Sequence, residues 1–288
     1  MWTQRLLRHL LTLLLTLLLG GLLGATLVRL APGFGVDEQE LNARLSDQSI
    51  QAVRQARAGE RNVMSFYLHY LAAILRGDFG VSRSFGRPVA ELFSERVRVT
   101  LCSVGLGLVG GWLSAFALAL SGALYRRWAY DLLTSLLSGL LLCLPSAVLA
   151  LLFLYLGGPS SLATALVVLP RIFRYSRNLL LQTYCLPHVL TAKAKGLGSV
   201  RILLWHVLPS AAPSLLALVG VSVSMAFGAA IPIEVLSDSP GIGQLAWQAA
   251  LGRDLPLLVN MTLFVTLVTL TANSLSDLAG KAFLRHQA

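Results

Sequence analysis

Long hydrophobic runs, separated by polar segments, dominate the chain. Six of these runs come close to the ~20 residues that a helix needs to cross the hydrocarbon core of a bilayer. They occupy residues 10–30, 99–122, 132–157, 160–181, 211–235 and 256–279. Because backbone polar groups in lipid must be satisfied within the segment, each run predicts a helix. The pattern therefore predicts an all-α membrane protein with six transmembrane helices.

Prolines interrupt three of the predicted spans. Pro145, Pro170 and Pro232 are expected to kink or break their helices locally, which membrane proteins tolerate where neighbouring helices cover the freed carbonyl groups. The fourth run, 160–181, is the least apolar, since Pro170 and three arginines crowd its end.

Composition agrees with a chain that faces lipid. Of 288 residues, 56% are hydrophobic and 12% are charged, and the mean hydropathy is +0.72. A soluble domain carries about twice that charge. The isoelectric point near 10.2 could indicate nucleic acid, but no basic face with interleaved aromatic residues supports that interpretation. The three widely spaced cysteines predict no disulfide or metal site, only small buried hydrophobic positions.

The distribution of charge predicts the orientation. With the N-terminus inside, the inner segments hold twelve of the 23 Lys and Arg residues against only Asp131 and Asp277, whereas the outer segments hold eleven residues of each sign. This is the positive-inside bias, so both termini are predicted to be cytoplasmic. Arg5 and Arg8 precede the first run, but no convincing small-residue cleavage site follows it, which favours a retained signal anchor over a cleaved signal peptide.

The segments between the spans divide the chain further. We expect a tail and first span at 1–30, an extracytoplasmic segment at 31–98 and a transmembrane domain at 99–288. Within the outer segment, charges at helical spacing predict one or two surface helices in 36–62. A helix on the membrane interface follows at 66–75, and then a Gly-rich turn leads to a helix after Pro88. The segment could cap the spans or dock an external partner.

The fifth span and the outer segment after it carry candidates for a pathway through the membrane. The turn SDSPGIG predicts an amphipathic helix at 244–251. Glu234 is either a functional ionisable group or the water boundary of its helix. The small, polar face of the fifth span either lines a pathway or packs closely against other helices. The pathway candidates are Ser222, Ser224, Gly228 and Glu234.

A basic, glycine-punctuated segment at 185–209 lies on the predicted inner side. Small residues around Ala192 and Ala194 are flanked by Lys193 and Lys195, and an apolar stretch resumes after the break at Gly196. A helix–Gly–helix element of this kind suits insertion into a groove on a soluble partner. The alternative is a juxtamembrane basic helix that only holds anionic lipid.

The motif TAKAKGL followed by HVLP resembles the EAA loop of ABC importer permeases. Its residues here are Thr191, Ala192, Lys193, Ala194, Lys195, Gly196, Leu197, His206, Val207, Leu208 and Pro209. Within that superfamily the chain resembles the B-type subunit of dipeptide, oligopeptide and nickel permeases. The likeness covers almost the whole chain in the right order, through the segments 27–33, 75–82, 86–92, 234–243, 253–256 and 273–277. Two features depart from it: Leu190 stands where the loop motif has glutamate, and the outer connection 157–161 is unusually short.

The resemblance implies a type I ABC importer permease fold and a location in the bacterial inner membrane. It also implies a C-type second permease in a heterodimer, two cytoplasmic ATPase subunits and an external substrate-binding protein. Residues 191–197 with Leu208 and Pro209 would couple to the ATPase. The chain has no G-x-x-x-x-G-K-[ST] phosphate loop, so we expect no catalysis and no cofactor of its own. The cargo, whether peptide, nickel chelate or a related solute, is not readable.

Two alternatives come from other classes. An intramembrane protease needs a buried Ser–His pair or two aspartates within spans, and neither Ser160, Ser161 nor Asp277 has an evident mate. An ion-coupled secondary transporter is expected to carry mid-span ionisable residues and internal repeats. Neither is evident, but physical argument from the sequence leaves such a carrier open.

Overall fold

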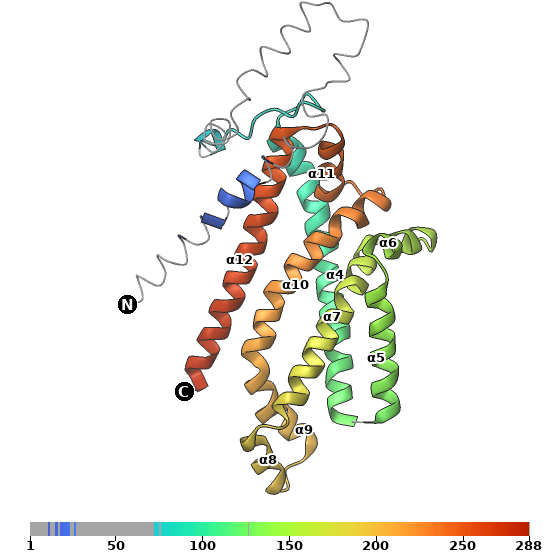
Figure 1. The fold of residues 1–288 in the computed structure, drawn as a ribbon, viewed down its shortest axis with the longest axis vertical. Coiled ribbons are helices and arrows are strands. Elements are labelled where there is room, and N and C mark those ends of the chain that lie inside the picture. The colour runs from blue at the N-terminus through green and yellow to red at the C-terminus, as the bar shows by residue number, and fades with distance from the viewer. Residues whose placement is uncertain are drawn as a thin grey trace, which may run out of the picture. The chain divides into compact units, whose positions relative to one another are not determined.

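Helices account for most of what the computed structural model describes, which is residues 72–74, 76–125 and 127–287 together with 11, 15–16, 18–23 and 26. Figure 1 shows these helices coloured in chain order. The chain divides into two compact units. One comprises Met1–Glu95 with Leu245–Leu267, and the other comprises Arg96–Gln244 with Val268–Ala288.

The first unit is organised around a buried aspartate. Asp254 accepts hydrogen bonds from the Ser82 hydroxyl (2.5 Å) and the backbone N–H groups of Ser84 (3.0 Å) and Leu257 (3.2 Å). It thereby caps the start of α12 (Leu255–Gln287) and fixes the Gly-rich turn that precedes α4 (Val89–Tyr125). Four residues C-terminal to Val89, the Phe93 ring meets that of Phe264 edge-on, with centroids 4.6 Å apart.

The second unit is a bundle in which α7 (Ser160–Thr183) packs on α5 (Trp128–Cys143), α6 (Ser146–Tyr155) and α10 (Leu208–Leu236). A Cβ on Gly107 of α4 would lie 2.6 Å from the Thr164 side chain of α7, so only glycine allows this crossing. The helices that follow α4 are α5 (Trp128–Cys143), α6 (Ser146–Tyr155), α7 (Ser160–Thr183), α8 (Pro187–Ala194), α9 (Ser199–Ile202), a π-helical turn (Leu203–Val207), α10 (Leu208–Leu236) and α11 (Ile242–Leu251).

Three described helices are long and apolar enough to cross a membrane: α4, α12, and α9 continued through the π-helical turn into α10. A fourth span arises if α5 and α6, which are bent by 96° at a short break, form one crossing. The expected continuous run 132–157 is therefore interrupted at Leu144 and Pro145, where the sequence predicted a kink. The helix α7 exists as predicted, but its arginines exclude it from the apolar set.

Other sequence predictions fare differently. The helix expected after Pro88 and the span expected from 99 are one continuous helix, α4. The helix predicted at 244–251 is confirmed as α11. The cysteine prediction is wrong, because Cys102, Cys143 and Cys185 are all exposed, as positions on a lipid-facing helix surface can be. Most of the predicted first span and all of the surface-helix segment 36–62 lie outside the described residues, as does 66–75 apart from helical residues 72–74.

Candidate functional site

The basic segment at 185–209, which the charge distribution predicts on the inner side, forms two short helices joined by a sharp turn at Gly196. The Gly196 N–H donates to the Lys193 carbonyl (2.9 Å) and the Leu197 N–H to the Ala192 carbonyl (3.4 Å). These two bonds make a Schellman motif, which satisfies the last carbonyl groups of α8 and requires a left-handed residue. Gly196 provides it with φ of +76°, and a Cβ there would meet no atom within 4 Å. The predicted helix–Gly–helix element is confirmed.

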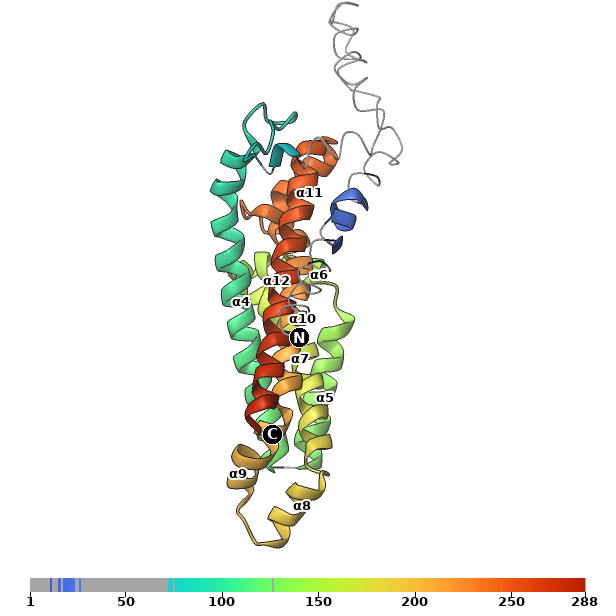
Figure 2. The ribbon, with the colours of Figure 1, turned by 90° about the vertical axis from the view of Figure 1, so that its left-hand side faces the viewer.

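One side of this element is packed and the other is open. Val189 and Ala192 of α8 are buried, and α8 packs on α9 and on the π-helical turn. The His188 ring also contacts the Ser210 hydroxyl at 3.1 Å, which ties α8 to the first turn of α10. Figure 2 shows α8 beyond the ends of α5 and α7. We call residues 187–207 the inner elbow.

The open side of the inner elbow is unusually apolar. Val200, Leu204 and Trp205 are exposed, Trp205 by 75%, and Leu190 is exposed by 50%. The polar candidates Thr191, Lys193 and Lys195 are exposed beside them, with the Lys193 ammonium 5.1 Å from the centre of the Tyr184 ring. Large exposed apolar side chains within one short segment, with basic neighbours in the sequence, are typical of a protein-binding element.

Two of the predicted pathway residues make contacts between helices. The Trp112 indole N–H of α4 donates to the Ser222 hydroxyl of α10 at 2.9 Å. The Asn273 side-chain amide of α12 donates to the Ser224 hydroxyl at 3.3 Å. Both serines therefore hold neighbouring helices in the membrane, and their role in a pathway stays a prediction. Gly228 is exposed, with open space where a Cβ would stand.

Glu234 lies 1% exposed beneath the turn that starts α11. Its Oε2 accepts a hydrogen bond from the Gly243 N–H at 2.6 Å. A Cβ on Gly241 would stand 2.2 Å from the same carboxylate, and one on Gly243 would stand 2.7 Å from the Ile231 Cα. The glycines of the SPGIG turn therefore let the backbone close over the acid. A carboxylate here complements the first N–H groups and the positive dipole end of α11.

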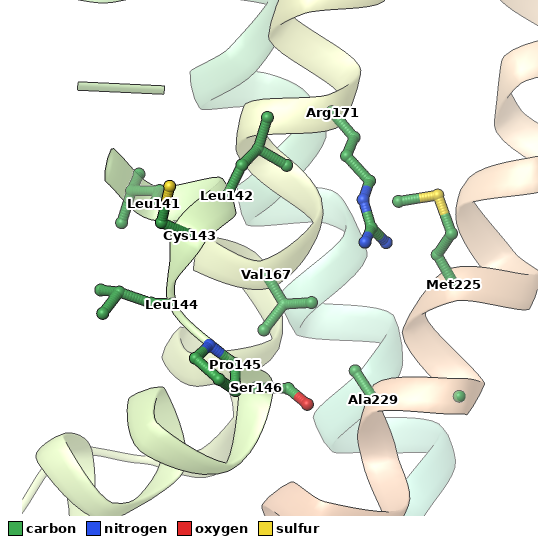
Figure 3. A pocket seen from close by; sticks show the side chains of 11 residues that line it. Leu141, Leu142, Cys143, Leu144, Pro145, Ser146, Val167, Arg171, Met225 and Ala229 are labelled. Atoms are coloured by element: carbon green, nitrogen blue, oxygen red, sulfur yellow. The ribbon is translucent and has the colours of Figure 1, made fainter. Parts of the chain in front are cut away.

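A groove of about 490 Å³ opens beside the break between α5 and α6 (Figure 3). Its floor comes from the break itself, and its walls come from α7 and α10. The lining includes Ser146, Val167, Arg171, Met225 and the predicted pathway residue Gly228. In the sequence, Arg171 counts among the charges predicted on the inner side and makes the fourth run less apolar. A charged residue eleven positions into a hydrophobic run was the signal that could have identified it.

Together these features define an integral membrane protein whose helical bundle carries an exposed apolar elbow. Among solved structures, the fold resembles a chain of the MetNI methionine ABC transporter in an inward-facing conformation, with a TM-score of 0.61 and 16% identity. The match covers 67% of this chain and 97% of that one.

Sequence comparison identifies the family. Residues 107–287 match the model described as binding-protein-dependent transport system inner membrane component. A putative peptide permease protein of Brucella suis is 29% identical over 88% of this chain and 89% of its own length. The glutathione transport system permease protein GsiC of Salmonella typhimurium is 26% identical over 80% of this chain and 81% of its own length.

The chain belongs to the family of binding-protein-dependent transport system inner membrane components. The predicted class, a permease subunit of an ABC importer in the bacterial inner membrane, is confirmed. The resemblance inferred from the motifs at 191–197 and 206–209 therefore led to the right family.

Proposed function

We propose that this chain forms one half of the translocation pathway of an ATP-driven importer for peptides or a related small solute. A C-type permease supplies the other half, two cytoplasmic ATPase subunits supply the energy, and an extracytoplasmic binding protein delivers the cargo. The chain crosses the membrane six times with both termini in the cytoplasm, and it holds no catalytic group or cofactor of its own. The names of the peptide and glutathione permeases among its relatives support the cargo class.

The observation that carries the proposal is the exposed apolar surface of the inner elbow. Trp205, Val200 and Leu204 present large side chains without covering residues, which is costly in water and is relieved when a partner covers them. The elbow is also joined directly to α10, because the π-helical turn runs without a break into that helix. A displacement of the elbow by the ATPase is therefore transmitted along a continuous helical rod.

Substitution of Gly196 tests the coupling. Gly196→Asp places a charged side chain on the elbow surface, and Gly157→Asp is a matched control. Both glycines have positive φ, +76° and +68°, and both lack any atom within 4 Å of a Cβ. The backbone strain of about 1–2 kcal/mol is therefore equal for the two variants, and only their positions differ.

We expect Gly196→Asp to abolish co-purification of the ATPase and ATP-driven uptake by the complex reconstituted in proteoliposomes, while Gly157→Asp retains both. Retained uptake in Gly196→Asp would contradict the coupling role. Uptake that follows an imposed ion gradient without ATP would instead favour a secondary transporter.

A further inference from the structure

Arg171 is the arginine of α7 that lines the groove. Six residues further along the helix, Arg177 is paired with Asp131 of α5, with Arg177 Nε 2.6 Å from the Asp131 Oδ1 and a second bond to the same carboxylate. The side chain of Arg171 is exposed and lines the groove, and it makes no ion pair or hydrogen bond with any described residue. The exposed Arg174 side chain makes none either, but it lies outside the groove lining. Arg171 and Arg177 are about 9 Å apart along the helix axis. Asp131 pairs with Arg177 near the C-terminal end of α7, and Arg171 lies farther from that end.

The direction of the Arg171 side chain also matters. Figure 3 shows its guanidinium between α7 and α10, near Met225 and above Val167, and therefore pointing away from the Arg177 end of α7. Ionisable groups within a membrane protein are costly, and they face cavities or bundle interiors where a partner neutralises them. The guanidinium thus occupies the groove without a counter-charge from the described part of the chain.

The groove is large enough to hold a small solute. Its volume of about 490 Å³ lies within the usual range for ligand sites, which combine apolar walls with a few polar groups. Val167 and Met225 are the apolar walls, and the Ser146 hydroxyl is a second polar group. Irregular backbone, as at Leu144 and Pro145, is tolerated at membrane depth where it is buried in protein or lines a water-filled cavity.

We propose that Arg171 binds the carboxylate of the transported solute as the solute passes through this groove. Guanidinium pairs with a carboxylate through two parallel N–H···O bonds, and every unmodified linear peptide carries one at its C-terminal end. The inference rests on the proposed import function and deepens it, because it assigns the chain a subsite for solutes with a free carboxylate. Gly228 also lines the groove, and a Cβ there would meet no atom within 4 Å.

A thiol reporter in the groove tests the subsite. Met225→Cys is introduced with Cys102, Cys143 and Cys185 changed to Ser, and the chain is assembled with its partner subunits in lipid nanodiscs. An anionic sulfonatoethyl methanethiosulfonate is expected to react faster than its cationic trimethylammonium analogue. Arg171→Gln should lower that rate ratio about tenfold, since the local anion concentration falls. Arg174→Gln, on the same helix but outside the groove lining, should leave it unchanged.

Protection identifies the ligand. Dialanine should slow labelling of this thiol, and dialanine amide, which lacks the carboxylate, should not. Loss of a bidentate charge-assisted contact should weaken protection about tenfold in Arg171→Gln, and Arg171→Lys should restore part of it. Equal protection by both peptides, or by neither, would overturn the proposal.

Three further results would contradict the subsite, and they differ in what they imply about the groove. Labelling blocked by phosphatidylglycerol but not by phosphatidylcholine nanodiscs would show a lipid site and overturn the proposal. A thiol reactive in the isolated chain but inaccessible to both reagents in the complex would show a covered subunit interface, with the same consequence. If dialanine fails to protect while uptake stays ATP-driven and sensitive to Gly196→Asp, the subsite is wrong and the import function stands.

Discussion

The two ends of α10 are built in opposite ways. At its start, the inner elbow turns through Gly196 and leaves Trp205, Val200 and Leu204 uncovered. At its other end, Glu234 is buried beneath the turn at Gly241 and bonded to the Gly243 N–H. One end of the helix is completed within the chain, and the other presents a surface that a second molecule can cover.

The glycines at the two ends of α10 are required for different physical reasons. Gly196 is needed for its backbone angle, and the space around it is empty. Gly241 and Gly243 have no positive φ and are needed because a Cβ would collide with Glu234 or with the Ile231 backbone. Substitutions at the Glu234 end should therefore lower stability, whereas substitutions at the inner elbow should lower assembly and leave the fold intact.

The largest expected effect on stability is that of Gly243→Ala. The added methyl would stand 2.7 Å from the Ile231 Cα and 2.9 Å from the Ala230 carbonyl oxygen, and backbone atoms cannot rotate away as a side chain can. We expect a loss of about 3 kcal/mol, measured as a lower midpoint of thermal unfolding in detergent. Gly228→Ala is the matched control, because its Cβ meets open space on the same helix as Ile231. Equal midpoints for the two variants would contradict the close packing of the turn.

Glu234→Ala should have the next largest effect on stability. Removing the carboxylate leaves the buried Gly243 N–H without its acceptor, which costs about 2 kcal/mol. Glu234→Gln keeps an acceptor oxygen of similar reach and should lose less. The same unfolding measurement ranks the three proteins, and a Gln variant as unstable as the Ala variant would show that charge rather than the hydrogen bond fixes the turn.

Trp205→Ala tests whether the inner elbow serves binding of the ATPase and not stability. Since the indole is 75% exposed, its removal should change the unfolding midpoint little. If the side chain is a central anchor for the ATPase, its loss should weaken association by about tenfold or more, measured by titrating purified ATPase against the permease in nanodiscs. Exposed Trp128 at the start of α5 provides a control: Trp128→Ala should leave association unchanged. A Trp205→Ala variant that is destabilised but still binds the ATPase normally would contradict this account, because the elbow would then serve stability and not assembly.

The smallest effect on stability is expected in the middle of α10. Ser222→Ala removes the acceptor of the Trp112 indole N–H, at a cost of about 1 kcal/mol. Because this bond joins α4 and α10, a modest fall in the unfolding midpoint checks it. If uptake falls far more than stability does, the hydroxyl serves the pathway as well as the packing.

Hydrophobic run length predicted the positions of the described spans well, because length and apolarity are local properties of the chain. The break after Cys143 was expected from Pro145, but its 96° bend was not, since the angle depends on how α6 packs against α7 and α10. The elbow was predicted because Gly196 after a basic helix is a local signal. The burial of Glu234 depends on a turn that folds back over it, and the groove at Arg171 depends on three elements meeting, so neither could be read from one segment.

The central claim is that the inner elbow faces the cytoplasm and is covered there by the ATPase. Val200→Cys, placed on the exposed surface in a cysteine-free background, tests it through labelling with a membrane-impermeant maleimide. We predict labelling in inside-out vesicles stripped of ATPase, protection when purified ATPase is added back, and no labelling in right-side-out vesicles. Labelling from the external face, or labelling that the ATPase leaves unchanged, would contradict the account.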